Sequence, residues 1–251
     1  MEILLIIKNI LDKIYFHPLF YIVLSISLIT GHFRNIIYFT SIIFIHELGH
    51  SITGIILGCK LNRIEIYPYG GCSKLEHDIN IRLYKELLIL IMGPITQIIF
   101  VYLINYFKID VNKYFYSYSN YILIFNLLPI YPLDGGKILN IFLSYFISFY
   151  KSLKYTYYSS YIFYLILLLS LFITNQRNLF LYLIITSLGI ELIKEIRNKL
   201  YLFRKFLLER LLKNYNFKKT KRVYNIQNFK RDYYHIIGNI TEKEYLKKYF
   251  I

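Results

Sequence analysis

The stretch IIFIHELGHSITGIILG, from Ile42 to Gly58, places two histidines and a glutamate inside an otherwise apolar segment. His46 and His50 are four residues apart, so on a helix they lie one turn apart and within about 40° of each other around the axis. Two imidazoles placed in this way can ligate one zinc ion, and Glu47 beside the first can act on a water molecule. The pattern therefore predicts a metal site on one face of a helix.

The apolar surroundings make this short pattern more specific. A glutamate without a partner in a membrane span costs ~2.5–3.5 kcal/mol or more, so ionisable residues at that depth generally serve a function. The alternative is that both histidines are only hydrogen-bonded within a helical bundle. We expect the two histidines and Glu47 to belong to a functional site.

The composition indicates an all-α polytopic membrane protein. Of 251 residues, 56% are hydrophobic, and the mean hydropathy of +0.42 is too high for an ordinary soluble domain. Several runs approach the ~18–20 apolar residues that cross a bilayer. We predict about six transmembrane helices, at 14–30, 36–58, 86–107, 119–149, 157–174 and 178–193.

The fourth span is interrupted by NLLPIYPLDGG, from Asn126 to Gly136, which contains two prolines and two glycines. Such a break is tolerated at membrane depth only where it is buried in protein or lines a watery cavity, so we place it in the interior of the bundle. A catalytic zinc needs a third protein ligand, and the carboxylate of Asp134 beside two glycines can approach a metal closely. The remaining histidines lie at a predicted membrane edge, in loops or in the tail: His17, His32, His77 and His235.

The formal charge of +15 raises the question of a nucleic-acid partner. Sixteen of the 30 lysines and arginines follow residue 193, next to apolar spans. Basic residues beside spans are typical of positive-inside signals and of contacts with lipid headgroups, and no motif for reading a nucleic-acid groove is present. We therefore expect the lipid bilayer, and no nucleic acid, as a partner. The basic residues of the short loops put both termini and the 59–85 loop on the cytoplasmic side.

The chain is expected to divide into three parts. Residues 1–193 form the six-span membrane domain, 194–215 a basic amphipathic helix or linker on the membrane surface, and 216–251 a small cytoplasmic α+β tail. In the first part, Arg63–Tyr67 alternates as a strand does and PYGG supplies a turn, which predicts a short re-entrant hairpin; an ordinary connecting loop is the alternative. If 63–72 forms a strand edge, it can pair with an extended substrate. In the tail, KRVYNI and YYHIIG are strand-like, and Thr241 with Glu244 makes a capping box for a last helix.

Gly54 and Gly58 follow the motif at the spacing of small residues that let a neighbouring helix approach closely. Such an approach would bring Asp134 to the metal. Incidental glycines, which are common in membrane helices, are the alternative.

The two motifs, HELGH in one span and NLLPIYPLDGG in a later one, resemble those of the site-2 proteases, a family of intramembrane zinc metalloproteases. The resemblance covers most of residues 14–150 and includes FHPLF, YPYGG and MGP. It implies a three-helix catalytic core that holds one Zn²⁺ ion through His46, His50 and Asp134, with Glu47 as the catalytic glutamate. It also implies contacts with the substrate, which we assign to Asn126, Tyr67, Gly70 and Gly71.

No PDZ insertion separates the two motifs, and the tail is short. In both features the chain resembles the sporulation branch of this family, which is found in endospore-forming bacteria. Members of that branch cleave the membrane-associated pro-sequence of a sigma-factor precursor. The resemblance thus implies such a precursor as substrate, membrane-bound inhibitory sporulation proteins as partners, and a mother-cell-derived membrane around the forespore as the location. Two features depart from the branch: Gln97 replaces a common asparagine, and only 36 residues follow Tyr215, where a nucleotide-sensing CBS domain is often found. The tail resembles the end of such a domain.

Three alternatives stay open. A site-2 protease of another branch would act on an anti-sigma factor or a signal-peptide remnant. A transporter or channel would use the same four polar residues, His46, Glu47, His50 and Asp134, for metal or proton passage, although transporters tend to show duplicated halves and the sequence shows none. A binding-only relative is disfavoured by the intact glutamate.

Overall fold

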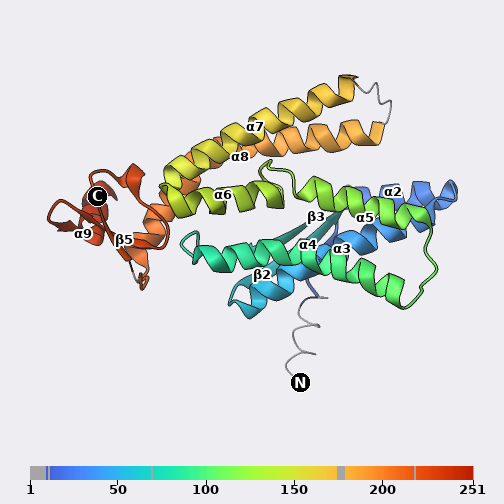
Figure 1. Cartoon of the computed structure of the whole chain (residues 1–251), viewed down its shortest axis with the longest axis horizontal. Helices are drawn as coiled ribbons and strands as arrows, with labels where there is room; N and C mark the ends of the chain where they lie inside the picture. The colour runs from blue at the N-terminus through green and yellow to red at the C-terminus, as the bar shows by residue number, and fades with distance from the viewer. Residues whose placement is uncertain (1–9, 11, 69, 174–178, 218, 251) are drawn as a thin grey trace. The chain divides into compact units, whose positions relative to one another are not determined.

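The structure is a computed structural model that describes residue 10 and residues 12–68, 70–173, 179–217 and 219–250. Most of these residues are helical (Figure 1). They divide into two compact units, residues 1–77 with 88–126 and residues 78–87 with 127–251. The elements in chain order are β1 (Ile14–Phe16), α2 (Pro18–Ile29), α3 (Phe33–Ile56), β2 (Lys60–Tyr67), β3 (Gly70–Glu76), α4 (Leu83–Tyr106), α5 (Lys113–Asn126), α6 (Asp134–Phe146), α7 (Phe149–Ile173), α8 (Leu179–Leu212), β4 (Lys219–Val223), a 3-10 helix (Ile226–Asn228), β5 (Tyr233–Ile237), β6 (Ile240–Thr241) and α9 (Glu242–Phe250).

In the first unit, β2 and β3 form the hairpin that the alternation of Arg63–Tyr67 predicts. β1 pairs with β2 in parallel and β3 pairs with it antiparallel, so β2 is the central strand of three. Ile64 and Ile66 of β2 are fully buried in a cluster that also contains Phe20 of α2. This burial sets the register of the hairpin, because a slip of one residue would turn the apolar side chains outward.

α3 and α4 are the two helices in the described residues whose length and hydropathy suffice to cross a membrane. They agree within a few residues with the predicted spans 36–58 and 86–107. α3 also packs against α5, where Ile42 and Ile43 lie in one buried cluster with Phe115 and Ile122.

The predicted fourth span, 119–149, consists of two helices, α5 and α6, with the predicted break between Asn126 and Asp134. The backbone between Asn126 and Asp134 carries Pro129 and Pro132. Each proline lacks a backbone N–H and disfavours helix in the residue before it, so two of them close together end the helix.

In the second unit, α7 begins at Phe149, well before the predicted start at 157. Its first turns carry small hydroxyl residues at four-residue spacing, Ser152, Thr156 and Ser160, and all three are fully buried. The amide of Asn140 on α6 donates to Thr156, and Ser144 donates to Ser152. Hydropathy does not detect a helix whose buried face is polar, so the predicted start at 157 is too late. The predicted span ends at 174 and 178 fall outside the described residues.

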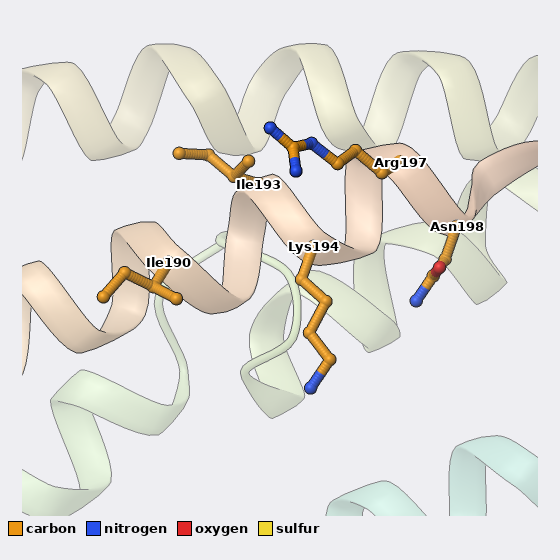
Figure 2. Close-up of a pocket in the computed structure, with 5 residues that line it drawn as sticks. All are labelled: Ile190, Ile193, Lys194, Arg197 and Asn198. Atoms are coloured by element: carbon orange, nitrogen blue, oxygen red, sulfur yellow. The ribbon is translucent and has the colours of Figure 1, made fainter.

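α8 continues without interruption from Leu179 to Leu212, so no helix end separates residues 193 and 194. Figure 1 shows α7 and α8 side by side. Midway along α8 lies a pocket of about 390 Å³ (Figure 2), around which Lys194 and Arg197 point to different sides of the helix. The residues that line it include no predicted site residue: Ile190, Ile193, Lys194, Arg197 and Asn198.

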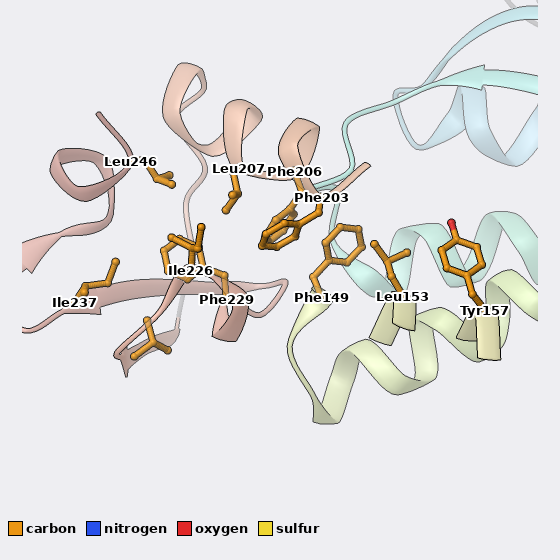
Figure 3. Packing of buried hydrophobic residues seen from close by; sticks show 11 residues of the cluster. Phe149, Leu153, Tyr157, Phe203, Phe206, Leu207, Ile226, Phe229, Ile237 and Leu246 are labelled. Atoms are coloured by element: carbon orange, nitrogen blue, oxygen red, sulfur yellow. The ribbon is translucent and has the colours of Figure 1, made fainter. Parts of the chain in front are cut away.

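The C-terminal tail has the predicted α+β composition, with β5 between β4 and β6. The capping box is confirmed, because the Glu244 carboxylate accepts the Thr241 N–H at 3.0 Å and the Thr241 hydroxyl accepts the Glu244 N–H at 3.4 Å. A buried cluster joins the tail to α7 and α8 (Figure 3). Its members include Phe149 and Leu153 of α7, Phe206 and Leu207 of α8, and Phe229 and Leu246 of the tail.

Arg210, near the end of α8, holds the second unit together through a buried guanidinium group that is 2% exposed. It donates to Glu242 Oε1 at 2.9 Å, to Asn80 Oδ1 at 2.7 Å, and to the carbonyl oxygens of Lys230 and Tyr233. A buried charge is tolerated when it is both paired and hydrogen-bonded, as here. The residues around Asn80 are thereby tied to α8 and to the tail.

His235 is fully buried beside the same carboxylate. The backbone N–H of Lys230 donates to its Nε2 at 2.9 Å, so the ring is neutral and its Nδ1–H donates to Glu242 Oε2 at 3.1 Å. Burial lowers the pKa of His235 below its ordinary value of 6.5. Burial alone would raise the pKa of Glu242, but the hydrogen bond from His235 and the charge of Arg210 hold it below 4.5.

We predict that Arg210→Met destabilises the tail. The change leaves Glu242 as a buried charge without its partner, so the free energy of unfolding of this region should fall by about 3–5 kcal/mol. Hydrogen exchange of the β5 and α9 amides in the full chain in detergent measures the loss of protection. Arg204→Met, at an exposed position on the same helix, should leave protection unchanged. Equal protection in both variants would contradict the role of the buried guanidinium.

The tail should also lose stability on acidification. The pKa of His235 is lower in the folded chain than in the unfolded chain, so as the pH falls below 6.5 the unfolded chain binds this proton more readily. The same holds for Glu242 below pH 4.5. Stability is thus complete above about pH 7 and falls as the pH decreases. Exchange of the β5 amides at pH 5 and 7, corrected for intrinsic rates, measures this. His235→Gln, which can donate to Glu242 and accept from Lys230 without titrating, should remove the part of the loss between pH 7 and 5; an unchanged pH dependence would exclude His235 as its source.

Candidate active site

α3 carries both predicted histidine ligands and the predicted catalytic carboxylate. His46, Glu47 and His50 are 1%, 7% and 6% exposed. The ring centroids of the two histidines are 4.9 Å apart, with an angle of 78° between the ring planes. The four-residue spacing thus produces two adjacent, buried imidazoles, as the sequence predicts.

The acceptor beside each ring determines its tautomer. His50 Nδ1 lies 2.8 Å from the carbonyl oxygen of Ile89, which can only accept, so Nδ1 carries the proton. His46 Nδ1 lies 2.9 Å from Oε1 of Gln97. A neutral ring protonated at Nδ1 has its lone pair at Nε2, and ligating histidines generally engage their other nitrogen in this way.

Gln97 is oriented so that its oxygen faces His46. Its Nε2 donates to the carbonyl oxygen of Ser119 at 2.8 Å and to the Ser119 hydroxyl at 3.0 Å. Because that carbonyl can only accept, the amide nitrogen must face α5. Gln97 is fully buried and connects α3, α4 and α5. The sequence marked it only as a departure from a family pattern, although a lone amide inside the apolar run of α4 was a signal for a buried polar contact.

Gly93 of α4 leaves room beside both imidazoles. A Cβ atom added at Gly93 would lie 2.3 Å from Nε2 of His50 and 3.0 Å from Nε2 of His46. Any side chain there would fill the space next to the lone pairs of both rings. The glycine of MGP therefore preserves the volume that a bound ion needs.

Asp134 is the first residue of α6 and is 8% exposed. A helix N-terminus favours a carboxylate because its unpaired backbone N–H groups carry partial positive charge. The segment before the helix folds back tightly, since a Cβ atom at Gly135 would lie 2.2 Å from the carbonyl oxygen of Leu127. The first glycine after Asp134 is thus required for the backbone path that buries the aspartate.

In the part of the chain that the structure describes, one group of histidine, cysteine and acidic residues can hold a metal ion, and it consists of His46, His50 and Asp134. Two imidazoles and one carboxylate are a donor set typical of catalytic zinc, which keeps a further position for water. All three residues are buried, and both histidines already have Nδ1 engaged. The residues present therefore fit Zn²⁺.

The strand β3 lies alongside Glu47. A Cβ atom at Gly71 would lie 2.6 Å from Cγ of Glu47 and 2.7 Å from Cγ2 of Ile43. Glycine at this position lets the backbone of β3 pass next to the carboxylate. Gly70, in contrast, has open space where a side chain would stand.

The other predicted residues have different local roles. The Tyr67 hydroxyl donates to Glu65 at 2.8 Å, and its ring lies 4.8 Å from that of His17. His17 caps α2, because its Nδ1 accepts the Leu19 N–H at 3.3 Å. Asn126 is the last residue of α5.

The expectation that Gly54 and Gly58 admit a neighbouring helix is wrong. A Cβ atom at Gly54 would lie 2.7 Å from Cδ1 of Leu75, so this glycine admits the hairpin instead. Gly58 follows the end of α3 and has a φ of 89°, a conformation that favours glycine. The close approach of helices occurs at Gly49, where a Cβ atom would lie 2.5 Å from the carbonyl oxygen of Met92 on α4.

A buried His–Glu–His helix with a donor set suited to zinc is typical of the zinc metalloproteases. The model of peptidase family M50 matches residues 35–111 and 109–170, which is more than half of the chain. The chain therefore belongs to peptidase family M50, the family of the site-2 proteases.

Two curated relatives and one solved structure are similar to this chain over different lengths. It is 30% identical to stage IV sporulation protein FB of Bacillus subtilis (strain 168), over 95% of this chain and 91% of that protein. It is 34% identical to a zinc metalloprotease of Methanocaldococcus jannaschii, over 47% of this chain and 37% of that protein. The solved site-2 protease from Methanocaldococcus jannaschii matches with a TM-score of 0.52 and 29% identity, over 71% of this chain and 87% of that one. The protein is thus an intramembrane metalloprotease of the site-2 type.

We predict that Gln97→Leu weakens zinc binding. The change removes the acceptor for His46 Nδ1–H, and losing such a partner typically lowers metal affinity by about 10- to 100-fold. Gln97→Asn keeps a side-chain amide with both an acceptor and a donor and should retain more of the affinity than Gln97→Leu. Competition with a zinc-chelating dye, on protein purified in detergent, measures both variants. Equal affinity of Gln97→Leu and the wild type would show that Gln97 does not hold the ring for the metal.

Proposed function

We propose that this protein is an intramembrane zinc endopeptidase that cleaves the membrane-associated pro-sequence of a sporulation sigma-factor precursor. The proposal is carried by the buried pair of imidazoles on α3, protonated at Nδ1, with a buried glutamate beside them. The substrate class is inferred from the 30% identity, along 95% of the chain, to a sporulation protein.

We assign one Zn²⁺ ion to His46, His50 and Asp134. When bound, zinc polarises a carbonyl and lowers the pKa of a nearby water towards neutrality. The assignment is supported by the engaged Nδ1 atoms, by the room at Gly93 and by the burial of Asp134 at a helix N-terminus. The two histidines alone would leave the donor set one ligand short.

Glu47 is assigned the proton transfers. Its carboxylate takes a proton from the attacking water and later delivers it to the leaving amine, as general base and then general acid. Its position next to His46 on the same helix puts it beside the metal ligands. Its burial keeps bulk water away from the transferred proton.

The substrate must be extended before it is cut, because the hydrogen bonds of a helix shield the carbonyl from attack. We propose that an extended stretch adds to the outer edge of β3. β2 is paired on both sides, so Arg63–Tyr67 offers no edge and the expected edge shifts to β3. Gly70 and Gly71 belong to this strand. Tyr67 and Asn126, at the ends of β2 and α5, are assigned further contacts with the substrate.

We further propose the six-span arrangement with both termini in the cytoplasm, and a location in a mother-cell-derived membrane around the forespore. α3 and α4 supply two spans by length and hydropathy. The basic residues of the short loops and of the tail support the orientation. Membrane-bound inhibitory sporulation proteins are the expected regulators.

Glu47→Gln tests the proposed mechanism. The variant should keep zinc, since the ligands are intact, and should lose cleavage by about 100-fold or more, since the general base is gone. The protein is co-expressed with the sigma-factor precursor, cleavage is scored by gel mobility, and zinc is measured on the purified protein. Glu191→Gln, a matched change at an exposed position of α8, should cleave normally. Full cleavage by Glu47→Gln would overturn the mechanism.

The same system tests the third ligand and the substrate. Asp134→Ala should lose zinc while its helix content is unchanged, and wild-type zinc content in this variant would assign the third ligand to another residue. If the wild type leaves the precursor intact but cuts a signal-peptide remnant or an anti-sigma factor, the substrate assignment is wrong and the enzymatic assignment stands.

A further inference from the structure

The strand β3 presents every second residue to α3. Gly71 lies against Glu47, and Leu75 lies against Gly54, about two turns further along the same helix. Ser73 stands between them and faces the same way, because side chains alternate along a strand. The side chains in the alternate positions are exposed: Cys72, Lys74 and Glu76.

Ser73 contacts the proposed general base directly. Its Oγ lies 2.6 Å from Oε2 of Glu47 and 3.0 Å from the backbone oxygen of the same residue. The hydroxyl of Ser51, on the next turn of α3 and fully buried, donates to Ser73 Oγ at 3.0 Å. Of the two acceptors on Glu47, the carboxylate oxygen is the closer and the charged one, so the Ser73 proton is directed to Oε2.

We propose that Ser73 is a positioning residue for Glu47. The inference rests on the proposed function, in which Glu47 handles the protons. A glutamate side chain has several rotatable bonds, and a short hydrogen bond to one ionised oxygen selects a single orientation. With Oε2 held by Ser73, Oε1 is the oxygen that remains to take the proton of the attacking water.

The contact couples the general base to the strand that binds the substrate. Ser73 is on β3, whose outer edge is the proposed place of strand addition, and its backbone is paired with Ile64 of β2 on the other side. The orientation of Glu47 therefore depends on the position of the strand with which the substrate pairs. Loss of the hydroxyl should lower the rate of the chemical step and leave substrate binding, which uses the backbone of β3, unchanged.

Ser73→Ala and Ser73→Thr test this inference with the sigma-factor precursor as the probe, in detergent with the full chain. Ser73→Ala should lower kcat by at least about tenfold, with KM and zinc content within about twofold of the wild type. Ser73→Thr keeps the hydroxyl on a residue that strands favour, and should restore kcat to within about threefold. Ser25→Ala, a matched change at an exposed position of α2, should have wild-type kinetics. Melting temperatures confirm that each variant is folded.

A wild-type kcat in Ser73→Ala would overturn the inference. So would a Ser73→Thr that is folded and as slow as Ser73→Ala, or a loss that appears only as a higher KM or as lost zinc, because a purely structural role predicts those results. Glu47→Gln distinguishes a failure of the proposed function from a failure of the positioning role alone. If Glu47→Gln still cleaves, the proposed function falls and this inference with it, whereas an inactive Glu47→Gln beside a fully active Ser73→Ala removes only the positioning role.

Discussion

The hydrogen bonds that the Nδ1–H groups of His46 and His50 donate to oxygens of α4 are the constraint on which the rest of the site depends. A buried imidazole without partners is costly, so each ring needs an acceptor supplied by the protein. Ile89 supplies a backbone carbonyl and Gln97 a side-chain oxygen, and both belong to α4. A second contact, from the Thr96 hydroxyl to the carbonyl oxygen of Ile45 at 3.2 Å, holds the same two helices in register. α3 and α4 must therefore pack in one way for the rings to be usable as ligands.

Close approach of backbone, rather than of side chains, shapes the space around these rings. Gly93 faces the Nε2 atoms from α4, and Gly71 faces Glu47 from β3. Both glycines bring main chain to where a side chain would otherwise displace an ion or a substrate. His46, Glu47 and His50 are buried, and in buried surroundings the fixed charge of a carboxylate acts more strongly than it would in solvent. The same small residues that make the site compact thus contribute to its chemistry.

Much of this arrangement could be predicted from the sequence, and the reasons for the failures are physical. The four-residue spacing of His46 and His50 puts both rings on one face of a helix, and this follows from local helical geometry alone. The sequence therefore predicts the adjacent rings correctly. The hairpin and the capping box at Thr241 are also local patterns. The predicted start of α7 is wrong because the buried face of this helix is polar. The role of Gln97 is hard to predict because its partners, His46 and Ser119, are far away in the chain. The helix contact expected at Gly54 is wrong because the spacing of glycines does not show which segment packs against them.

Within the second unit, the tail provides hydrogen bonds at the beginning of α4. The first N–H groups of a helix have no partner within it and need an acceptor. Asp232 of the tail accepts the N–H of Leu83 at 3.2 Å, and the guanidinium of Arg231 donates to the carbonyl oxygen of Ile81 at 2.9 Å. Because α4 continues from Leu83 to Tyr106, the helix whose beginning is capped by the tail is also the helix that carries Gln97. The tail thus completes the hydrogen bonding around the beginning of this helix, and Arg210 ties the same region to α8 through Asn80.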